Sequence, residues 1–276
     1  MKIAFLGGGN MAGALIGGLL GRGFAAADIH VIELASATRE RLRTRFGVHT
    51  MAAPDADVRH SDALVLAVKP QQMKAALAPL AGALQETLVI SIAAGLRLAD
   101  IGRWLGGTGG PHTRLVRCMP NTPALIGAGV TGMYAAPAVD AAGRKTAERI
   151  LAAVGSTLWV DEEARLDAVT GISGSGPAYV FHFIEALEAA GLAQGLDAAS
   201  ARRLALDTVL GAAQLALASD DPPAALREKV TSQGGTTAAA LAHLAAAGWY
   251  DALIGAVAAA SARSQELGEQ FSQDRT

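Results

Sequence analysis

Cysteine, aromatic side chains and charge are all scarce in this 276-residue sequence. The single cysteine, Cys118, has no partner for an intramolecular disulfide, which excludes a disulfide-stabilised scaffold and fits a reducing cytosol. Aromatic residues make up 4% of the chain, and the formal net charge is −2. Such a composition provides neither a base-stacking surface nor a positive field that would attract nucleic acid or an anionic membrane. We therefore expect a cytoplasmic protein whose partners include neither nucleic acids nor membranes.

Long uncharged runs are rare too, and the exception lies at the start of the chain. Residues 3–21 form nineteen uncharged positions behind Lys2, about the length of a membrane span or a signal peptide. Seven of the nineteen are glycine, three of them consecutive at 7–9, and each glycine costs a helix about 1 kcal/mol relative to alanine. We therefore interpret this run as a short strand, a tight turn and a helix.

Glycine, in contrast, is abundant: it occupies 32 of 276 positions, more than its usual share of about 7%. The glycines show no collagen-like period and do not lie in a serine-rich linker. We therefore expect them at specific positions where the backbone conformation requires glycine. At about 150 residues per domain, the length of the chain predicts two domains.

The pattern of apolar residues changes near residue 160. Before it, apolar runs of strand length alternate with helical segments, which is typical of a parallel sheet covered on both faces. The expected strands lie at 2–6, 29–34, 62–68, 87–93, 115–118, 130–134 and 156–160. After it, apolar residues recur at helical spacing, as at Val180, Phe183 and Leu187. We predict an α/β Rossmann-type dinucleotide-binding domain at 1–160, followed by an all-α domain at 161–276.

The turn at residues 7–12, Gly-Gly-Gly-Asn-Met-Ala, matches the pattern G-x-G-x-x-G/A between a predicted strand and a predicted helix. Gly7 would permit the tight turn, Gly9 would let the backbone approach a pyrophosphate, and the helix start would supply free amides and a partial positive charge. The alternative is a glycine turn with a structural role only. We expect a dinucleotide site.

Glu33 ends the second predicted strand, where an acidic residue can bind the ribose hydroxyls of a dinucleotide. A carboxylate at this position favours NADH and repels the 2′-phosphate of NADPH. Arg39 and Arg41 lie on the following helix and could compensate if they fold back. Since Glu33 could also be a solvated strand end, the choice between NADH and NADPH stays open.

Four later segments carry a family resemblance: AVKP at 67–70, RCMPNTP at 117–123, SGSGPAY at 173–179 and VTSQGGTT at 230–237. Together with the opening turn, they resemble the pyrroline-5-carboxylate reductase family over nearly the whole chain and in the expected order. The resemblance implies reduction of the cyclic imine Δ1-pyrroline-5-carboxylate to L-proline by hydride from NAD(P)H, the last step of proline biosynthesis. It also implies a homodimer with interlocked helical domains, within a larger ring in some relatives.

The resemblance further implies the residues that meet the ligands. Those that would bind the cofactor are Leu6, Gly7, Gly8, Gly9, Asn10, Met11, Glu33, Ala67, Val68, Lys69, Pro70, Ile92, Ala93, Ala94 and Asn121. Those that would bind the substrate are Glu163, Ser175, Gly176, Pro177, Ser232, Gly234, Gly235, Thr236 and Thr237, with residues 232–237 coming from the neighbouring subunit. No metal is expected.

The sequence departs from the family pattern at three positions. Gln233 stands where a proline is frequent, but both following glycines and Thr237 are retained. Pro54 replaces a frequent asparagine near the adenosine phosphate, and Leu34 follows Glu33 in place of a serine or threonine suited to a 2′-phosphate. These differences weaken any inference of an NADPH preference from the family.

The substrate offers a carboxylate and a C=N bond. Consecutive amides at a helix start, with a hydroxyl beside them, can bind a carboxylate, and Gly234–Thr237 has that composition. An ordinary helix cap is the alternative. A protonated imine accepts hydride readily, so the enzyme mainly has to orient the reactants. Thr237 is the candidate catalytic residue. Lys69 could be read as a general acid, but we expect it to face the cofactor region or solvent.

Two other readings remain open. One is a related two-domain reductase for a β-hydroxy acid or another imine, which would need a lysine and an asparagine on the first long helix of the second domain. That helix instead carries Phe181, His182 and Glu185. The other is a non-catalytic NAD(P)-binding scaffold, against which the intact substrate segments argue.

Overall fold

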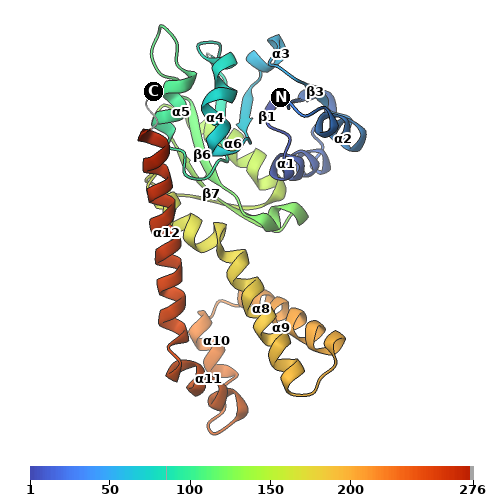
Figure 1. Cartoon of the computed structure of the whole chain (residues 1–276), viewed down its shortest axis with the longest axis vertical. Helices are drawn as coiled ribbons and strands as arrows, with labels where there is room; N and C mark the ends of the chain where they lie inside the picture. Colours follow the sequence, from blue (N-terminus) through green and yellow to red (C-terminus); the bar gives the residue numbers. More distant parts are fainter. Residues whose placement is uncertain (85, 274–276) are drawn as a thin grey trace. The chain divides into compact units, whose positions relative to one another are not determined.

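A computed structural model describes residues 1–84 and 86–273 of the chain (Figure 1). Among these residues, one sheet has the strand order β3-β2-β1-β4-β5-β6-β7-β8. Its strands are β1 (Ile3–Leu6), β2 (Ile29–Ile32), β3 (His49–Met51), β4 (Ala63–Leu66), β5 (Leu88–Ser91), β6 (Leu115–Met119), β7 (Gly129–Ala135) and β8 (Gly155–Trp159). The strand order reverses at β1, which pairs with β2 on one side and β4 on the other. In open α/β sheets, ligands bind at the carboxyl edge beside such a reversal.

All pairings in this sheet are parallel except that of β6 with β7. The connection between β6 and β7 is short, and a parallel pair would need a crossover of a dozen residues or more. A second departure from expectation is β3, a three-residue edge strand of His, Thr and Met that carries no apolar run. The α/β fold itself is confirmed.

Helices cover both faces of the sheet (Figure 1). They are α1 (Asn10–Gly21), α2 (Ser36–Phe46), α3 (Ala56–Arg59), α4 (Pro70–Leu77), α5 (Leu98–Leu105), α6 (Ala141–Leu151) and α7 (Arg165–Val169), with 3₁₀ turns at Ala26–Asp28, Ala78–Leu80, Thr122–Ile126 and Ala152–Val154. The helices that follow are α8 (Gly176–Ala193), α9 (Ala198–Ala218), α10 (Pro223–Lys229), α11 (Thr236–Ala246) and α12 (Trp249–Gln273). The predicted run of helices in the second half is confirmed.

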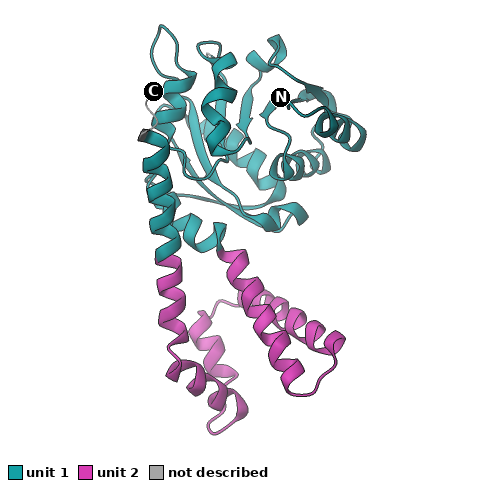
Figure 2. Cartoon of the chain, in the orientation of Figure 1, with its two compact units in different colours: residues 1–175, 259–276 teal, residues 176–258 magenta. Residues whose placement is uncertain are grey.

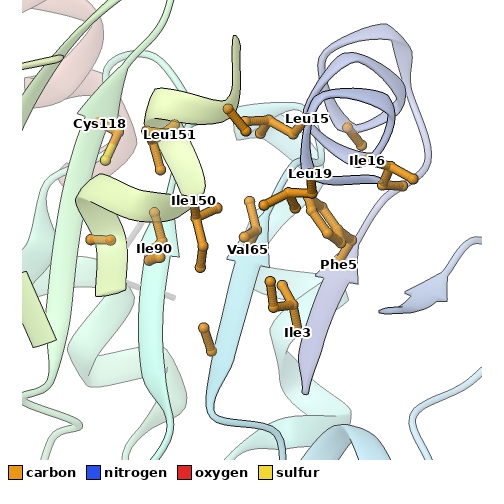
Figure 3. Packing of buried hydrophobic residues seen from close by; sticks show 14 of the residues in the cluster. Ile3, Phe5, Leu15, Ile16, Leu19, Val65, Ile90, Cys118, Ile150 and Leu151 are labelled. Atoms are coloured by element: carbon orange, nitrogen blue, oxygen red, sulfur yellow. The ribbon is translucent and has the colours of Figure 1, made fainter. Parts of the chain in front are cut away.

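Alternate strand residues divide between two apolar layers, because successive side chains of a strand point to opposite faces. On one face, Ile3 and Phe5 of β1 pack with Leu15 and Leu19 of α1 (Figure 3). On the other face, Ala4 and Leu6 belong to the cluster formed with α4 and α5. Burying one leucine side chain contributes about 1.5–3 kcal/mol relative to leaving it exposed, so these layers hold the sheet and its carboxyl edge in place.

The chain forms two compact units that are not contiguous in sequence (Figure 2). Unit 1 comprises Met1–Ser175 with Ala259–Thr276, and unit 2 comprises Gly176–Ala258. This division differs from the expected single boundary after residue 160. The reason is packing: Leu166 of α7 is fully buried, and Val169 lies against Gly132 of β7, so α7 belongs with the sheet.

Among its described residues, unit 2 consists of helices and their connections and contains no strand. Gly191 of α8 packs against Ala201 of α9, where a Cβ on the glycine would lie 2.9 Å from the alanine side chain. In the described part of the chain, no single helix is long and apolar enough to cross a membrane. The bent pair 236–246 and 249–272 meets that criterion of length and composition only when both helices are taken together.

Candidate active site

The predicted glycine turn joins the end of β1 to the start of α1. Gly7 has a φ of +101°, and a Cβ there would lie 2.7 Å from the Ala67 carbonyl oxygen, so both conformation and space require glycine. Gly9 is the N-cap of α1 and makes no side-chain cap, and no heavy atom lies within 4 Å of where its Cβ would be. The first amides of α1 are therefore open to an anion, as a dinucleotide pyrophosphate requires.

Glu33 follows β2 and is anchored on the glycine turn. Its Oε2 accepts a hydrogen bond from the Gly8 amide at 2.9 Å, and its Oε1 accepts one from the Ala35 amide at 2.9 Å. Arg39 does not fold toward this carboxylate. Its guanidinium donates to the carbonyls of Glu33 and Leu34, both at 2.7 Å. Glu33 is therefore no freely solvated strand end.

The other predicted cofactor residues of unit 1 follow three neighbouring strands. Leu6, Leu66 and Ser91 are aligned in the registers of β1, β4 and β5. The Ala67 amide donates to the Leu6 carbonyl at 2.8 Å, and the Ile92 amide donates to the Leu66 carbonyl at 3.1 Å. The parallel registers thus bring the segments 67–70 and 92–94 to the same edge as the glycine turn.

Two predicted cofactor residues at this edge have definite backbone roles. Lys69 is the exposed N-cap of α4, with Pro70 in the first turn, where a missing amide costs nothing. Asn121 is nearly buried, and its Oδ1 accepts a hydrogen bond from the Val130 amide at 2.9 Å. The Asn121 side chain therefore holds the connection between β6 and β7.

Glu163, predicted to bind substrate, is engaged within unit 1. Its Oε1 accepts hydrogen bonds from the Leu98 amide at 2.9 Å and from Arg117 Nη1 at 3.2 Å. Arg117 and Asp167, which the sequence analysis did not single out as functional, are 3% and 1% exposed. Burial lowers the pKa of the Arg117 guanidinium, while the neighbouring carboxylates of Glu163 and Asp167 oppose that shift. In the sequence, the signal for such a buried charge is an arginine inside the otherwise apolar strand LVRCM, because a buried arginine needs carboxylate partners.

The SGSGPAY segment lies where the chain passes from unit 1 to unit 2. Residues Thr170–Gly174 form one turn of π-helix, closed by the Ser175 amide donating to the Thr170 carbonyl at 2.8 Å. Such turns occur frequently at functional sites. Gly174 packs on Met119, whereas no atom lies within 4 Å of a Cβ at Gly176, the first residue of α8 and the neighbour of Pro177.

The VTSQGGTT segment in unit 2 forms the start of α11. Gly234 has a φ of +70°, and Gly235 is the N-cap without a side-chain cap. The Gly235 amide donates to the Ser232 carbonyl at 3.0 Å, and a Cβ on Gly235 would lie only 2.5 Å from the Ser232 hydroxyl oxygen. The amides of Thr236 and Thr237 thus lie in an uncapped first turn, which is the geometry expected of a carboxylate site.

These features define the class of the protein. A reversed parallel sheet with an uncapped glycine turn at its carboxyl edge, and an acidic residue after the second strand, is a Rossmann-type dinucleotide-binding fold of the oxidoreductases. In agreement, residues 2–95 match the family "NADP oxidoreductase coenzyme F420-dependent", and residues 163–267 match the family "Pyrroline-5-carboxylate reductase dimerisation".

Whole-chain comparisons identify the family. The pyrroline-5-carboxylate reductase of Pseudomonas aeruginosa is 46% identical over 273 residues, covering 99% of this chain and 98% of that protein. The Synechocystis enzyme is 43% identical, covering 98% and 99%. The solved structure from Coxiella burnetii is 40% identical, with a TM-score of 0.90 over 96% of this chain and 98% of that one. The chain belongs to the pyrroline-5-carboxylate reductase family.

A further solved relative bears on the cofactor. The Plasmodium falciparum pyrroline carboxylate reductase, described with NADP bound, is 29% identical, with a TM-score of 0.84 over 97% of this chain and 98% of that one. Its fold therefore matches that of the present chain over both units.

Proposed function

We propose that this protein reduces Δ1-pyrroline-5-carboxylate to L-proline with hydride from NADH or NADPH. The observation that carries the proposal is the near-complete coverage of reductases that are up to 46% identical, which extends over both the dinucleotide-binding unit and the helical unit. The reaction adds hydride to the carbon of a C=N bond and a proton to its nitrogen. The related β-hydroxy acid reductase and the non-catalytic scaffold are less favoured. The relatives that align with this chain over almost their whole length are named as pyrroline-5-carboxylate reductases.

The residues at the carboxyl edge of the sheet fit a nicotinamide dinucleotide, which would supply the hydride. Gly7 to Met11 would hold the pyrophosphate through backbone amides of the uncapped helix start. Glu33 would bind the adenosine ribose, and its fixed carboxylate favours an unphosphorylated 2′-hydroxyl. Segments 67–70 and 92–94 would flank the cofactor, with Ile92 to Ala94 nearest the nicotinamide.

The start of α11 from the neighbouring subunit would bind the substrate carboxylate. Gly234 and Gly235 turn the backbone so that the amides of the first turn are uncapped, and the half-buried Thr237 adds a hydroxyl. A carboxylate held by charge-assisted hydrogen bonds fixes the ring, so the C=N carbon can be presented to the cofactor. Thr237 is also the candidate to assist proton delivery to the nitrogen.

The helical unit would form the homodimer. Large apolar side chains of unit 2 are exposed in the isolated chain, which is unusual for a surface without a partner. They include Phe181, Leu204, Leu210, Leu215, Leu217, Tyr250 and Ile254. This exposure supports a self-association surface on α8, α9 and α12, in keeping with the dimerisation family that matches residues 163–267.

Addition of pyrroline-5-carboxylate to the purified protein with NADH or NADPH tests the reaction. We expect loss of the reduced-cofactor absorbance, with formation of one L-proline for each cofactor oxidised. Cofactor binding without turnover would support the scaffold instead. Turnover of a β-hydroxy acid, with none of the imine, would support the related reductase.

A further inference from the structure

A compact cluster of four charges lies in unit 1, with Arg117 and Asp167 buried and Arg97 and Glu163 partly exposed. Arg117 of β6 lies between two carboxylates: its Nη1 is 3.2 Å from Glu163 Oε1, and its Nη2 is 3.6 Å from Asp167 Oδ1. Arg97 makes a further ion pair with Asp167, at 3.1 Å. The two guanidiniums balance the two carboxylates, which is what burial of charge requires.

The cluster is bonded directly to the segment that follows β5, residues 92–98. At the end of this segment, the Leu98 amide donates a hydrogen bond to Glu163 Oε1 at 2.9 Å. One residue earlier, the side chain of Arg97 reaches Asp167. Gly95, within the same segment, has a φ of +79° and so makes a turn that other residues rarely adopt. The segment is thus fixed by bonds to side chains that lie far away in sequence.

The carboxyl-terminal part of α12, which belongs to unit 1, packs on the same segment. Ser264 donates a hydrogen bond to Asp167 Oδ1 at 2.7 Å. At Gly268, a Cβ would lie 2.9 Å from Arg97 Nε and 3.0 Å from the Gly95 carbonyl oxygen, so the helix approaches the segment closely. A Cβ at Gly95 would lie 3.4 Å from both Leu267 and Phe271. Residues 92–98 are therefore held between the Glu163–Asp167 region and α12.

We propose that Glu163, Arg117 and Asp167 are positioning residues that fix segment 92–98 against the nicotinamide end of the cofactor. The inference rests on the proposed function, in which Ile92 to Ala94 lie beside the nicotinamide. It also gives Glu163 a different role from direct substrate binding, because the Leu98 amide and Arg117, which donate to its carboxylate, both belong to unit 1. Hydride transfer needs donor and acceptor near 3–3.5 Å, and a misplacement of about 1 Å can cost roughly 100-fold in rate.

Three variants separate this role from its alternatives. Glu163→Ala removes the acceptor for the Leu98 amide, so we expect kcat to fall about tenfold or more while the Kd for NAD(P)H changes less than about threefold. Glu163→Gln keeps an oxygen acceptor for that amide but not the charge that pairs with Arg117, so it should recover part of the lost kcat. Asp140→Ala is the control, because it removes the side-chain N-cap of α6 and so lowers stability without touching segment 92–98.

The deuterium isotope effect measured with 4-deuterated cofactor is the second readout. A misplaced nicotinamide slows the hydride step, so Glu163→Ala should show a larger isotope effect on kcat, and Asp140→Ala should not. The proposal is overturned if both Glu163 variants raise the KM for the imine equally with no change in kcat, since that pattern denotes direct substrate contact. It is also overturned if the kcat of Glu163→Ala falls no further than that of Asp140→Ala.

Binding measurements without substrate separate this proposal from the proposed function. The fluorescence of bound NAD(P)H depends on the surroundings of the nicotinamide. We expect its intensity or polarisation to differ between the parent and Glu163→Ala, and also between the parent and Ser264→Ala, at saturating cofactor. A parent protein that binds the cofactor but does not reduce the imine would contradict the proposed function alone. Identical fluorescence in all three proteins would contradict the positioning role.

Discussion

The Glu33 carboxylate and the Gly8 amide are joined by a hydrogen bond of 2.9 Å, which links the end of β2 to the glycine turn after β1. This bond places a negative charge where a dinucleotide would present its adenosine ribose. Arg39 donates to the carbonyls of Glu33 and Leu34, whereas Arg41 folds back onto the glycine turn, with its Nη2 3.5 Å from the Gly8 carbonyl oxygen. Glu33 thus disfavours a phosphorylated ribose, while Arg41 beside the same turn would offset part of that repulsion.

Replacing Glu33 with serine should shift cofactor preference toward NADPH. Removal of the carboxylate ends its repulsion of the 2′-phosphate, so the ratio of kcat/KM for NADPH to that for NADH should rise about tenfold or more, corresponding to about 1.4 kcal/mol. Glu40→Ser, on the exposed face of α2, is the matched control and should leave the ratio unchanged. An unchanged ratio in Glu33→Ser would show that Glu33 does not meet the ribose.

Gly7→Ala should weaken binding of either dinucleotide. The added methyl group would lie 2.7 Å from the Ala67 carbonyl oxygen at a φ of +101°, so the turn has to move. We expect the Kd for NADH, measured by fluorescence titration, to rise about tenfold or more. Gly21→Ala is the control, because a Cβ at Gly21 would meet no other group within 4 Å. The Kd of this variant for NADH should match that of the parent. Equal affinity in both variants would contradict the role of this turn.

Thr237→Ala should raise the KM for pyrroline-5-carboxylate. Loss of one hydrogen bond to a charged carboxylate costs about 1.5–3 kcal/mol, which corresponds to roughly tenfold or more in KM. Cofactor affinity should stay nearly constant, and Thr237→Ser should retain low KM because it keeps the hydroxyl. Steady-state kinetics against imine concentration checks the prediction, and parental KM in Thr237→Ala would remove Thr237 from the site.

The thiol of Cys118 should be unreactive in the folded protein. Cys118 is 1% exposed, and burial raises the pKa of its thiol, so little thiolate forms and reagents cannot reach it. Since the chain has one cysteine, a thiol-reactive chromophore reports on this side chain alone. We expect no reaction in buffer and one equivalent in denaturant. Fast labelling without denaturant would show that the layer between β6 and its covering helices opens readily.

Leu210→Asp should disrupt self-association through unit 2. Leu210 is exposed on α9 in the isolated chain, and a charge buried in an apolar interface without a partner is strongly unfavourable. Sedimentation or light scattering should show a smaller species than the parent. Leu34→Asp places the same charge on an exposed leucine of unit 1 and should leave the assembly unchanged. An identical mass for both variants would exclude this face of α9 from the interface.

Local sequence patterns predicted the elements whose conformation depends mainly on residues close to them in the chain. The β1–turn–α1 unit, Glu33 at the end of β2, and the extent of α9 follow from apolar periodicity and glycine placement. The strand β3 escaped detection because its three residues occupy a sheet edge and bury little apolar surface. The antiparallel β7 was not foreseen either, since apolar content alone does not set strand direction.

The charged cluster escaped sequence analysis for a different reason. Arg117 and Glu163 are 46 residues apart, and Asp167 and Ser264 are 97 apart, so no local spacing relates them. Only the family resemblance pointed to Glu163. It implied a substrate-binding residue and did not indicate which groups contact the carboxylate. Tertiary packing alone reveals that its carboxylate contacts the backbone at Leu98.

The passage of α12 from unit 2 back into unit 1 has a consequence for synthesis. The amino-terminal part of a chain begins to fold while the rest is still on the ribosome. Ser264 and its neighbours on α12 reach Asp167 and segment 92–98 only after the whole helical unit has been translated. Contacts of such long sequence separation form slowly. Unit 1 therefore remains incomplete until residues 259–273 have emerged, and a fragment that stops after residue 175 lacks the helix that packs on segment 92–98.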